Sequence, residues 1–170
     1  MVDRRATGDA CFADAEDAEK KLMGRPGECD EMDLPEAFKR ADENGRRGIV
    51  ILGDPGSGKT THLKRVLLWC LQGGLTKLGL ADEMIPVFLP LRDLTDLDHG
   101  LDAFIQAQLH KPHLGTPAGF GKRLRERGHL LLLLDGLDEV ADTAHRARVA
   151  RWIDQALLAY PTCRFVVTCR

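Results

Sequence analysis

Residues 53–60 read Gly-Asp-Pro-Gly-Ser-Gly-Lys-Thr, a full match to the phosphate-binding pattern G-x-x-x-x-G-K-[ST]. The run before this stretch, residues 48–52, is short, β-branched and apolar, and it predicts a buried strand. After the stretch, apolar residues recur at helical spacing between residues 63 and 70. The sequence therefore predicts a strand, a glycine-rich loop and a helix in direct succession.

We call residues 53–60 the glycine loop. Closely spaced glycines let successive backbone N–H groups curl around an anion, and the helix that follows adds its positive N-terminal end. In such a loop Lys59 reaches the outer phosphates of a nucleotide and the Thr60 hydroxyl holds Mg²⁺. The predicted nucleotide-binding residues are Gly53, Asp54, Pro55, Gly56, Ser57, Gly58, Lys59, Thr60 and Thr61. The alternative is a glycine-rich turn without a ligand.

A second motif follows at residues 130–140, which read Leu-Leu-Leu-Leu-Leu-Asp-Gly-Leu-Asp-Glu-Val. Such an apolar run predicts a central parallel strand covered on both faces, and sheets of this kind bind ligands outside the carboxyl ends of their strands. Asp135 is therefore expected beside the glycine loop, where its carboxylate can hold Mg²⁺ with Thr60 on the other side. A buried helix segment is the alternative for the leucines.

Two more acids, Asp138 and Glu139, follow Asp135 within a few residues, and we call residues 135–139 the acidic segment. Hydrolysis of a terminal phosphate needs one carboxylate that holds the metal and another that orients the attacking water. Glu139 is the first candidate for orienting the water and Asp138 is the second. The alternative for each acid is that it caps the following helix or faces solvent.

The pairing of residues 53–61 with residues 130–140 resembles the NACHT family of signal-transduction NTPases. In that family a small residue follows the Mg²⁺-binding acid, and an acidic pair follows downstream. The same pattern is present here in Asp135, Gly136, Asp138 and Glu139. The resemblance implies that Asp135 binds Mg²⁺ and that the domain is a nucleotide-dependent switch.

Two further segments extend the resemblance over residues 46–170. Residues 85–94, Ile-Pro-Val-Phe-Leu-Pro-Leu-Arg-Asp-Leu, resemble the strand that the family places between its two nucleotide motifs. Residues 165–170 resemble its next strand, whose final arginine senses the γ-phosphate, and the resemblance implies this role for Arg170. A guanidinium suits phosphate oxygens, while a frayed surface charge is the alternative for a chain end. Arg92 is expected to be a surface or ion-pair residue.

The predicted elements alternate between strand and helix, which indicates an α/β fold. We expect the three-layer sandwich of a P-loop NTPase, with a mostly parallel sheet and helices on both faces. The strands are expected at residues 48–52, 85–91, 129–135 and 163–169, and the helices at residues 34–43, 60–72, 98–110, 117–127 and 144–159. The resemblance implies the strand order 2-3-4-1.

The sequence divides into two parts. Residues 1–33 are acidic and nearly without large apolar side chains, which predicts a flexible tail with a short helix at about 10–23. Residues 34–170 are predicted to be a partial NACHT-like domain, truncated after the fourth strand. A fifth strand, a helical lid and a winged-helix domain normally follow in the family. The resemblance therefore implies that the chain binds nucleotide weakly, or that self-association or a partner chain supplies the missing lid.

Composition limits the remaining possibilities. The 170 residues are 44% hydrophobic with a formal net charge of -2, enough for one core but not for two full domains. This charge gives no signal of nucleic-acid or anionic-membrane binding. Without a signal peptide or a membrane-spanning run, a cytoplasmic location is predicted. The five cysteines form no C-x-x-C pair, so the expected metal is Mg²⁺.

Three functions are compatible with these motifs. The first is an ATP-binding switch module whose hydrolysis is slow and whose nucleotide state controls assembly. The second is a nucleotide-binding interaction module without useful turnover. The third is another P-loop enzyme, a GTPase or a small-molecule kinase. No Asn-Lys-x-Asp guanine motif occurs, and an acidic pair suits hydrolysis better than transfer to an acceptor, so ATP and Mg²⁺ are the predicted cofactors.

Overall fold

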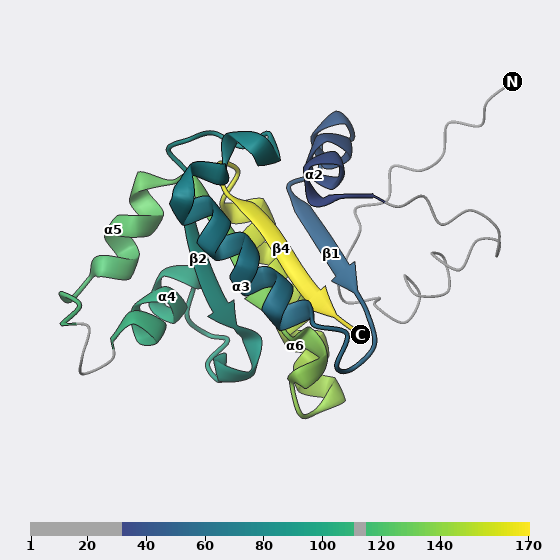
Figure 1. Ribbon diagram of the computed structural model, residues 1–170. Helices are drawn as coiled ribbons and strands as arrows, with labels where there is room; N and C mark the ends of the chain where they lie inside the picture. The colour runs from purple at the N-terminus through teal and green to yellow at the C-terminus, as the bar shows by residue number, and fades with distance from the viewer. Residues whose placement is uncertain (1–31, 111–114) are drawn as a thin grey trace, which may run out of the picture.

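The computed structural model describes residues 32–110 and 115–170, which form an α/β fold around one four-stranded sheet (Figure 1). Its strands are β1 (Gly48–Leu52), β2 (Ile85–Pro90), β3 (Leu130–Asp135) and β4 (Arg164–Cys169). All pairs are parallel, and the order is β1-β4-β3-β2. This is the predicted order 2-3-4-1 read from the opposite edge, so the predicted fold class and strand order are confirmed.

Helices cover both faces of the sheet and complete the three layers (Figure 1). They are α2 (Leu34–Glu43), α3 (Lys59–Trp69), α4 (Leu101–Leu109), α5 (Phe120–Arg127) and α6 (Thr143–Ala159). The helices α2 and α3 lie on one face, while α4 and α6 lie on the other. Among the described helices, none has both the length and the apolar character that crossing a bilayer requires.

The strand β3 lies inside the sheet and is completely buried. Its leucines alternate between two cores, as the pleat of a strand requires. Leu130, Leu132 and Leu134 pack with α4 and α6, whereas Leu131 and Leu133 pack with α2 and α3. This position explains why the leucine run has no polar alternation and confirms the predicted central strand.

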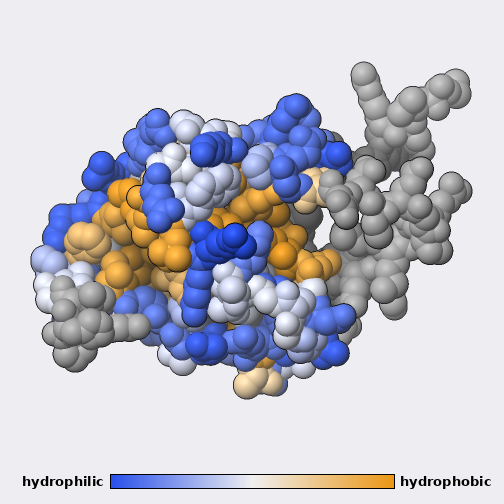
Figure 2. Space-filling view, in the orientation of Figure 1, coloured by the Kyte–Doolittle hydropathy of each residue, from blue (hydrophilic) through white to orange (hydrophobic). Residues whose placement is uncertain are grey.

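The strand β1 departs from the prediction, because it is not buried. It pairs with β4 on one side only, and it is an edge strand of the described sheet. Val50 and Leu52 are 42% and 45% exposed. Figure 2 presents the face of the molecule that carries α3, and apolar side chains gather on both sides of this helix. An apolar, β-branched run predicts a strand correctly but does not report how many neighbours the strand has.

At the other edge, β2 carries two prolines that suit its position. The Ile85 N–H donates to the carbonyl of His129, so residues 85, 87 and 89 turn their N–H groups toward β3. Residues 86 and 90 then face the open edge, where the missing N–H of a proline costs no ladder hydrogen bond. Pro86 and Pro90 therefore leave this edge a poor template for another strand.

The helix boundaries differ from the prediction where glycine or proline intervenes. The helix predicted at 60–72 is α3 as far as Trp69, and the chain then kinks at Gln72 and Gly73, whose dihedral angles are not helical and of which Gly73 has a φ of 83°. The helices predicted at 98–110 and 117–127 begin later, at Leu101 and Phe120, each after a glycine N-cap. Cys70 is buried as expected, and burial raises the pKa of its thiol.

The predictions for the N-terminal tail mainly concern residues that the structure does not describe. The tail at 1–33, apart from its last two residues, lies outside the described part of the chain, as does its short helix. Among the 3-10 helices of the described residues, Leu91–Asp93 follows β2 and Leu137–Glu139 follows β3. They belong to the edge of the sheet where the carboxyl ends of the strands meet.

Candidate functional site

The glycine loop connects β1 to α3 in a conformation that depends on glycine. Gly56 and Gly58 have φ angles of 81° and 86°, in the left-handed region that other residues rarely adopt. Gly58 is the N-cap of α3, and no side chain accepts a hydrogen bond from the first turn of that helix. The first N–H groups of α3 therefore remain available for an anion.

Contacts inside the glycine loop keep it compact. A Cβ atom at Gly53 would lie 2.7 Å from the Ser57 hydroxyl oxygen, so a larger residue there would displace the Ser57 side chain. The Lys59 ammonium donates to the carbonyl oxygens of Gly53 and Asp54, the latter at 3.1 Å. The only positive side chain of the loop thus lies directly over its own backbone.

The end of β4 joins the glycine loop to the rest of the sheet. Leu52 is in register with Cys169, and the Gly53 N–H donates to the Cys169 carbonyl over 3.2 Å. Arg170 is the next residue and is exposed. The backbone thus places Arg170 beside the first residue of the loop.

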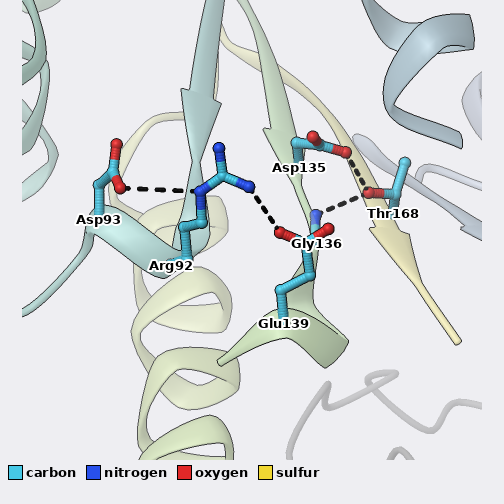
Figure 3. Close-up of polar contacts among 6 residues, drawn as sticks. All are labelled: Arg92, Asp93, Asp135, Gly136, Glu139 and Thr168. Atoms are coloured by element: carbon cyan, nitrogen blue, oxygen red, sulfur yellow. Dashed lines mark hydrogen bonds and ion pairs between the residues drawn. The ribbon is translucent and has the colours of Figure 1, made fainter. Parts of the chain in front are cut away.

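Asp135 ends β3 and is held by β4. The carboxylate is 4% exposed, and its Oδ1 accepts a hydrogen bond of 2.8 Å from the Thr168 hydroxyl. The same hydroxyl oxygen accepts one of 2.7 Å from the Gly136 N–H (Figure 3). Thr168 therefore fixes both the carboxylate and the turn that follows it.

Thr168 is the residue that the sequence reasoning missed. It is completely buried, and with Asp135 it is one of two polar residues buried in the described chain. Its signal was present, because Thr168 is the hydroxyl residue within an otherwise apolar run at 165–169. A buried hydroxyl needs a partner, which would have pointed to the neighbouring strand end.

Asp138 lies in the 3-10 helix after β3. One of its carboxylate oxygens, Oδ1, is buried without a hydrogen-bond partner in the described structure. Arg146 of α6 donates to the backbone carbonyls of Asp138 and Val140 at 3.2 and 3.0 Å. The turn is thereby anchored on α6, while the Asp138 carboxylate remains available.

Glu139 has a different environment from Asp138. Its Oε2 lies 2.9 Å from Nη1 of Arg92, which follows β2 (Figure 3). The two side chains are 44% and 61% exposed. The expectation that Arg92 is an ion-pair residue is confirmed, and the partner is the acid predicted to orient water.

The capping alternative for these two acids is wrong. The N-cap of α6 is Asp142, whose Oδ2 accepts a hydrogen bond of 2.8 Å from the His145 N–H. Asp138 and Glu139 precede this cap and belong to the 3-10 turn at the end of β3. They are therefore placed by the sheet edge and not by the helix terminus.

Burial and the charged side chains of both motifs affect the pKa of the Cys169 thiol. Burial raises the pKa of this thiol, and the Arg170 N–H opposes the effect. Asp138, Arg146 and Lys59 also act on that pKa by their charges. Lys59 of the glycine loop and Asp138 of the acidic segment thus lie around the same strand end.

Comparison with known proteins agrees with this geometry. The family model described as NACHT domain matches residues 47–170. The chain belongs to the NACHT family. No curated protein and no solved structure matches it. The NACHT match identifies the chain as a nucleotide-binding module of NTPase type, and the resemblance inferred from its sequence is confirmed.

The residues of this NACHT domain fit a phosphate group and a divalent cation. Gly56 and Gly58 give the loop left-handed turns that let successive backbone N–H groups curl around an anion, and the loop leads into a helix N-terminus without a side-chain cap. The carboxylate of Asp135 and the unpartnered Oδ1 of Asp138 supply hard oxygen donors. The donor set therefore suits Mg²⁺ with a nucleotide.

Proposed function

We propose that this chain is an ATP-binding switch module of the NACHT type that hydrolyses ATP slowly and controls assembly through its nucleotide state. The observation that carries the proposal is the junction at β4. Through Cys169 and Thr168, this strand contacts the glycine loop on one side and Asp135 on the other. A phosphate cradle and a metal-binding acid on adjoining strand ends are the parts that nucleoside triphosphate chemistry needs.

We assign phosphate binding and Mg²⁺ binding to different residues of the site. The N–H groups of the loop and Lys59 bind the phosphates, for which Lys59 exchanges its carbonyl partners for phosphate oxygens. Thr60 and Asp135 would hold Mg²⁺, which neutralises charge on the outer phosphates. No group of three or more His, Cys, Asp or Glu gathers as a metal site in the described residues, so phosphate oxygens and water would complete the ligands.

For the hydrolytic step, Glu139 is proposed to orient the attacking water, with Asp138 as the second candidate. The unpartnered Oδ1 of Asp138 supports its candidacy, because a buried carboxylate oxygen lacking a partner is rare in proteins. Arg170, next to the loop, is proposed to contact the γ-phosphate. A guanidinium there offers paired donors to phosphate oxygens.

The proposal is tested by removing the positive charge of the glycine loop. Lys59→Ala should weaken binding of Mg-ATP about tenfold or more, which corresponds to roughly 1.4 kcal/mol, measured by calorimetric titration. Lys77→Ala is the matched control, since Lys77 is an exposed lysine on another segment. Equal affinity of wild type and Lys59→Ala would contradict the assignment of the glycine loop as the phosphate-binding site. Competition of GTP with ATP in the same titration would test the preference for ATP.

The second candidate is an interaction module that binds nucleotide without turnover. The observation that favours it is the Arg92 contact, because Glu139 is engaged by a guanidinium. Hydrolysis measured against Lys59→Ala separates the two functions. If wild type binds Mg-ATP but releases phosphate no faster than Lys59→Ala, the interaction module is correct.

We also propose a cytoplasmic location and nucleotide-dependent self-association. The exposed apolar side chains Val50 and Leu52 of β1 support self-association, since exposed apolar groups favour protein contacts. Sedimentation velocity in Mg-ADP and in Mg-ATP tests it. The same monomer in both nucleotides would contradict this proposal.

A further inference from the structure

We propose that Arg92 restrains Glu139, holding its carboxylate away from the phosphate site and thereby limiting the rate of ATP hydrolysis. The inference rests on the proposed hydrolysis and adds a residue that belongs to neither nucleotide motif. Its basis is the ion pair of 2.9 Å between Arg92 Nη1 and Glu139 Oε2, which joins the turns after β2 and β3.

The strand order gives the direction of the restraint. The glycine loop follows β1, and the sheet runs β1-β4-β3-β2, so Arg92 lies on the far side of β3 from the loop. In Figure 3, the Asp135 carboxylate points toward Thr168 on β4. The Glu139 carboxylate is instead paired with Arg92, which follows the end of β2. The pair thus draws Glu139 away from the side of the sheet where the phosphates are expected.

The turn at Gly136 accommodates this position of Glu139. A Cβ atom at Gly136 would lie 2.9 Å from the Glu139 carboxyl carbon and 3.1 Å from its Oε2. The Glu139 side chain is therefore folded back over the backbone of the turn, with Arg92 on its outer side. Asp93 adds a second, longer contact to Arg92 at 3.9 Å, which helps keep the guanidinium in place.

The exposure of the pair explains why it can act as a restraint that is released. Ion pairs between exposed side chains contribute little to stability, because water screens them. A contact of this kind can be broken when the carboxylate is needed elsewhere, and its loss should change a rate only modestly. The ion pair also holds Oε2 of this carboxylate toward Arg92, whereas orienting the attacking water requires the carboxylate at the phosphate site.

The test compares Arg92→Ala with Arg40→Ala. Arg40 forms an exposed ion pair with Glu36 at 3.1 Å on α2, so its removal costs the same charge and a similar contact outside the site. Arg92→Ala should raise kcat at saturating Mg-ATP about two- to fivefold, the range expected from an exposed ion pair, with KM unchanged. Arg40→Ala should leave kcat unchanged, and Arg92→Lys should stay close to wild type because it keeps the charge.

Two further measurements make the inference independent of a single rate. Adding Glu139→Gln to Arg92→Ala should abolish the gain in kcat. In urea unfolding without nucleotide, the midpoint decreases of Arg92→Ala and Glu139→Ala should not add in the double variant, because both remove the same contact. Additive decreases would overturn the inference even without any activity measurement.

The outcomes also separate this inference from the proposed function. If wild type hydrolyses ATP above Lys59→Ala and Arg92→Ala is equal or slower, the restraint is wrong and the hydrolytic function stands. If neither wild type nor Arg92→Ala exceeds Lys59→Ala, the hydrolytic function is wrong and the restraint is wrong with it. A faster Arg92→Ala with an unchanged KM supports both.

Discussion

The three carboxylates of the acidic segment are close in sequence but differ in their surroundings. Asp135 is buried and accepts a hydrogen bond from Thr168, Asp138 has a buried oxygen without a partner, and Glu139 is exposed and paired with Arg92. Different environments suit different chemical tasks. At the scale of single residues, each carboxylate therefore has its own test.

The first residue to test is Asp135. In Asp135→Asn, the amide oxygen can still accept the Thr168 hydrogen bond, so the fold should persist while the negative charge is lost. We expect ATP affinity to fall about tenfold when Mg²⁺ is present, and no difference from wild type in EDTA. Calorimetric titration under both conditions measures this. A loss that persists in EDTA would identify Asp135 as a structural residue.

The second is Glu139. Glu139→Gln keeps the size and polarity of the side chain but removes the carboxylate proposed to orient water. Turnover should fall by about two orders of magnitude while ATP binding stays within a few-fold, measured by phosphate release and by titration. If Glu139→Gln hydrolyses ATP as fast as wild type, the same experiment on Asp138→Asn decides whether the second candidate acts instead.

At the scale of elements, β4 is the connection between the two motifs. It pairs with β1 and with β3 along parallel registers, and its last residues contact both the glycine loop and the acidic segment. The hydroxyl of Thr168 is the link to β3, since it both donates to Asp135 and accepts from Gly136. The geometry of the site thus depends on one buried side chain of a strand that belongs to neither motif.

This link predicts a stability effect. Thr168→Val keeps the shape but leaves the Gly136 N–H and Asp135 Oδ1 without their partner, which should lower the free energy of unfolding by about 2 kcal/mol. Thr168→Ser keeps the hydroxyl and should lose only methyl packing, about 1 kcal/mol. Urea denaturation measures both. A valine variant more stable than the serine variant would contradict the role of the hydroxyl.

At the scale of the whole molecule, the site lies at one end of the sheet whose two faces pack into the two hydrophobic cores. The leucines of β3 pack into the cores on both faces, and the acidic segment follows the last of them directly. Aromatic packing between α4 and α6 adds to one core through Phe104 and Trp152, whose ring centroids are 6.0 Å apart. Binding at the strand ends should therefore stabilise the fold as a unit.

This coupling makes nucleotide binding measurable as stability. Mg-ATP at 100 times its dissociation constant should raise the free energy of unfolding by about 2.7 kcal/mol. At the same concentration Lys59→Ala, with affinity about tenfold lower, should gain about 1.3 kcal/mol less. Urea denaturation with and without Mg-ATP provides the values. An equal gain in both proteins would mean that ATP binds without using Lys59.

The sequence alone determined the elements and the two motifs. The bounds of α2 and β1 were predicted correctly, because local signals define them: Pro35 and the acid N-cap Asp33 begin the helix, and a short apolar run before glycine forms the strand. The leucine run predicted a buried central strand, since burial on both faces removes polar alternation. The NACHT match confirmed the family that the motifs indicated.

Only the tertiary structure decided which side chains meet. The hydrogen bond from Thr168 to Asp135 and the ion pair of Arg92 with Glu139 join residues 33 and 47 positions apart. The exposed position of β1 was also beyond the sequence, because its composition does not report its neighbours. The physical reason is the same in each case: periodicity and turn signals act within a few residues, whereas contacts across parallel strands depend on the order in which the whole sheet assembles.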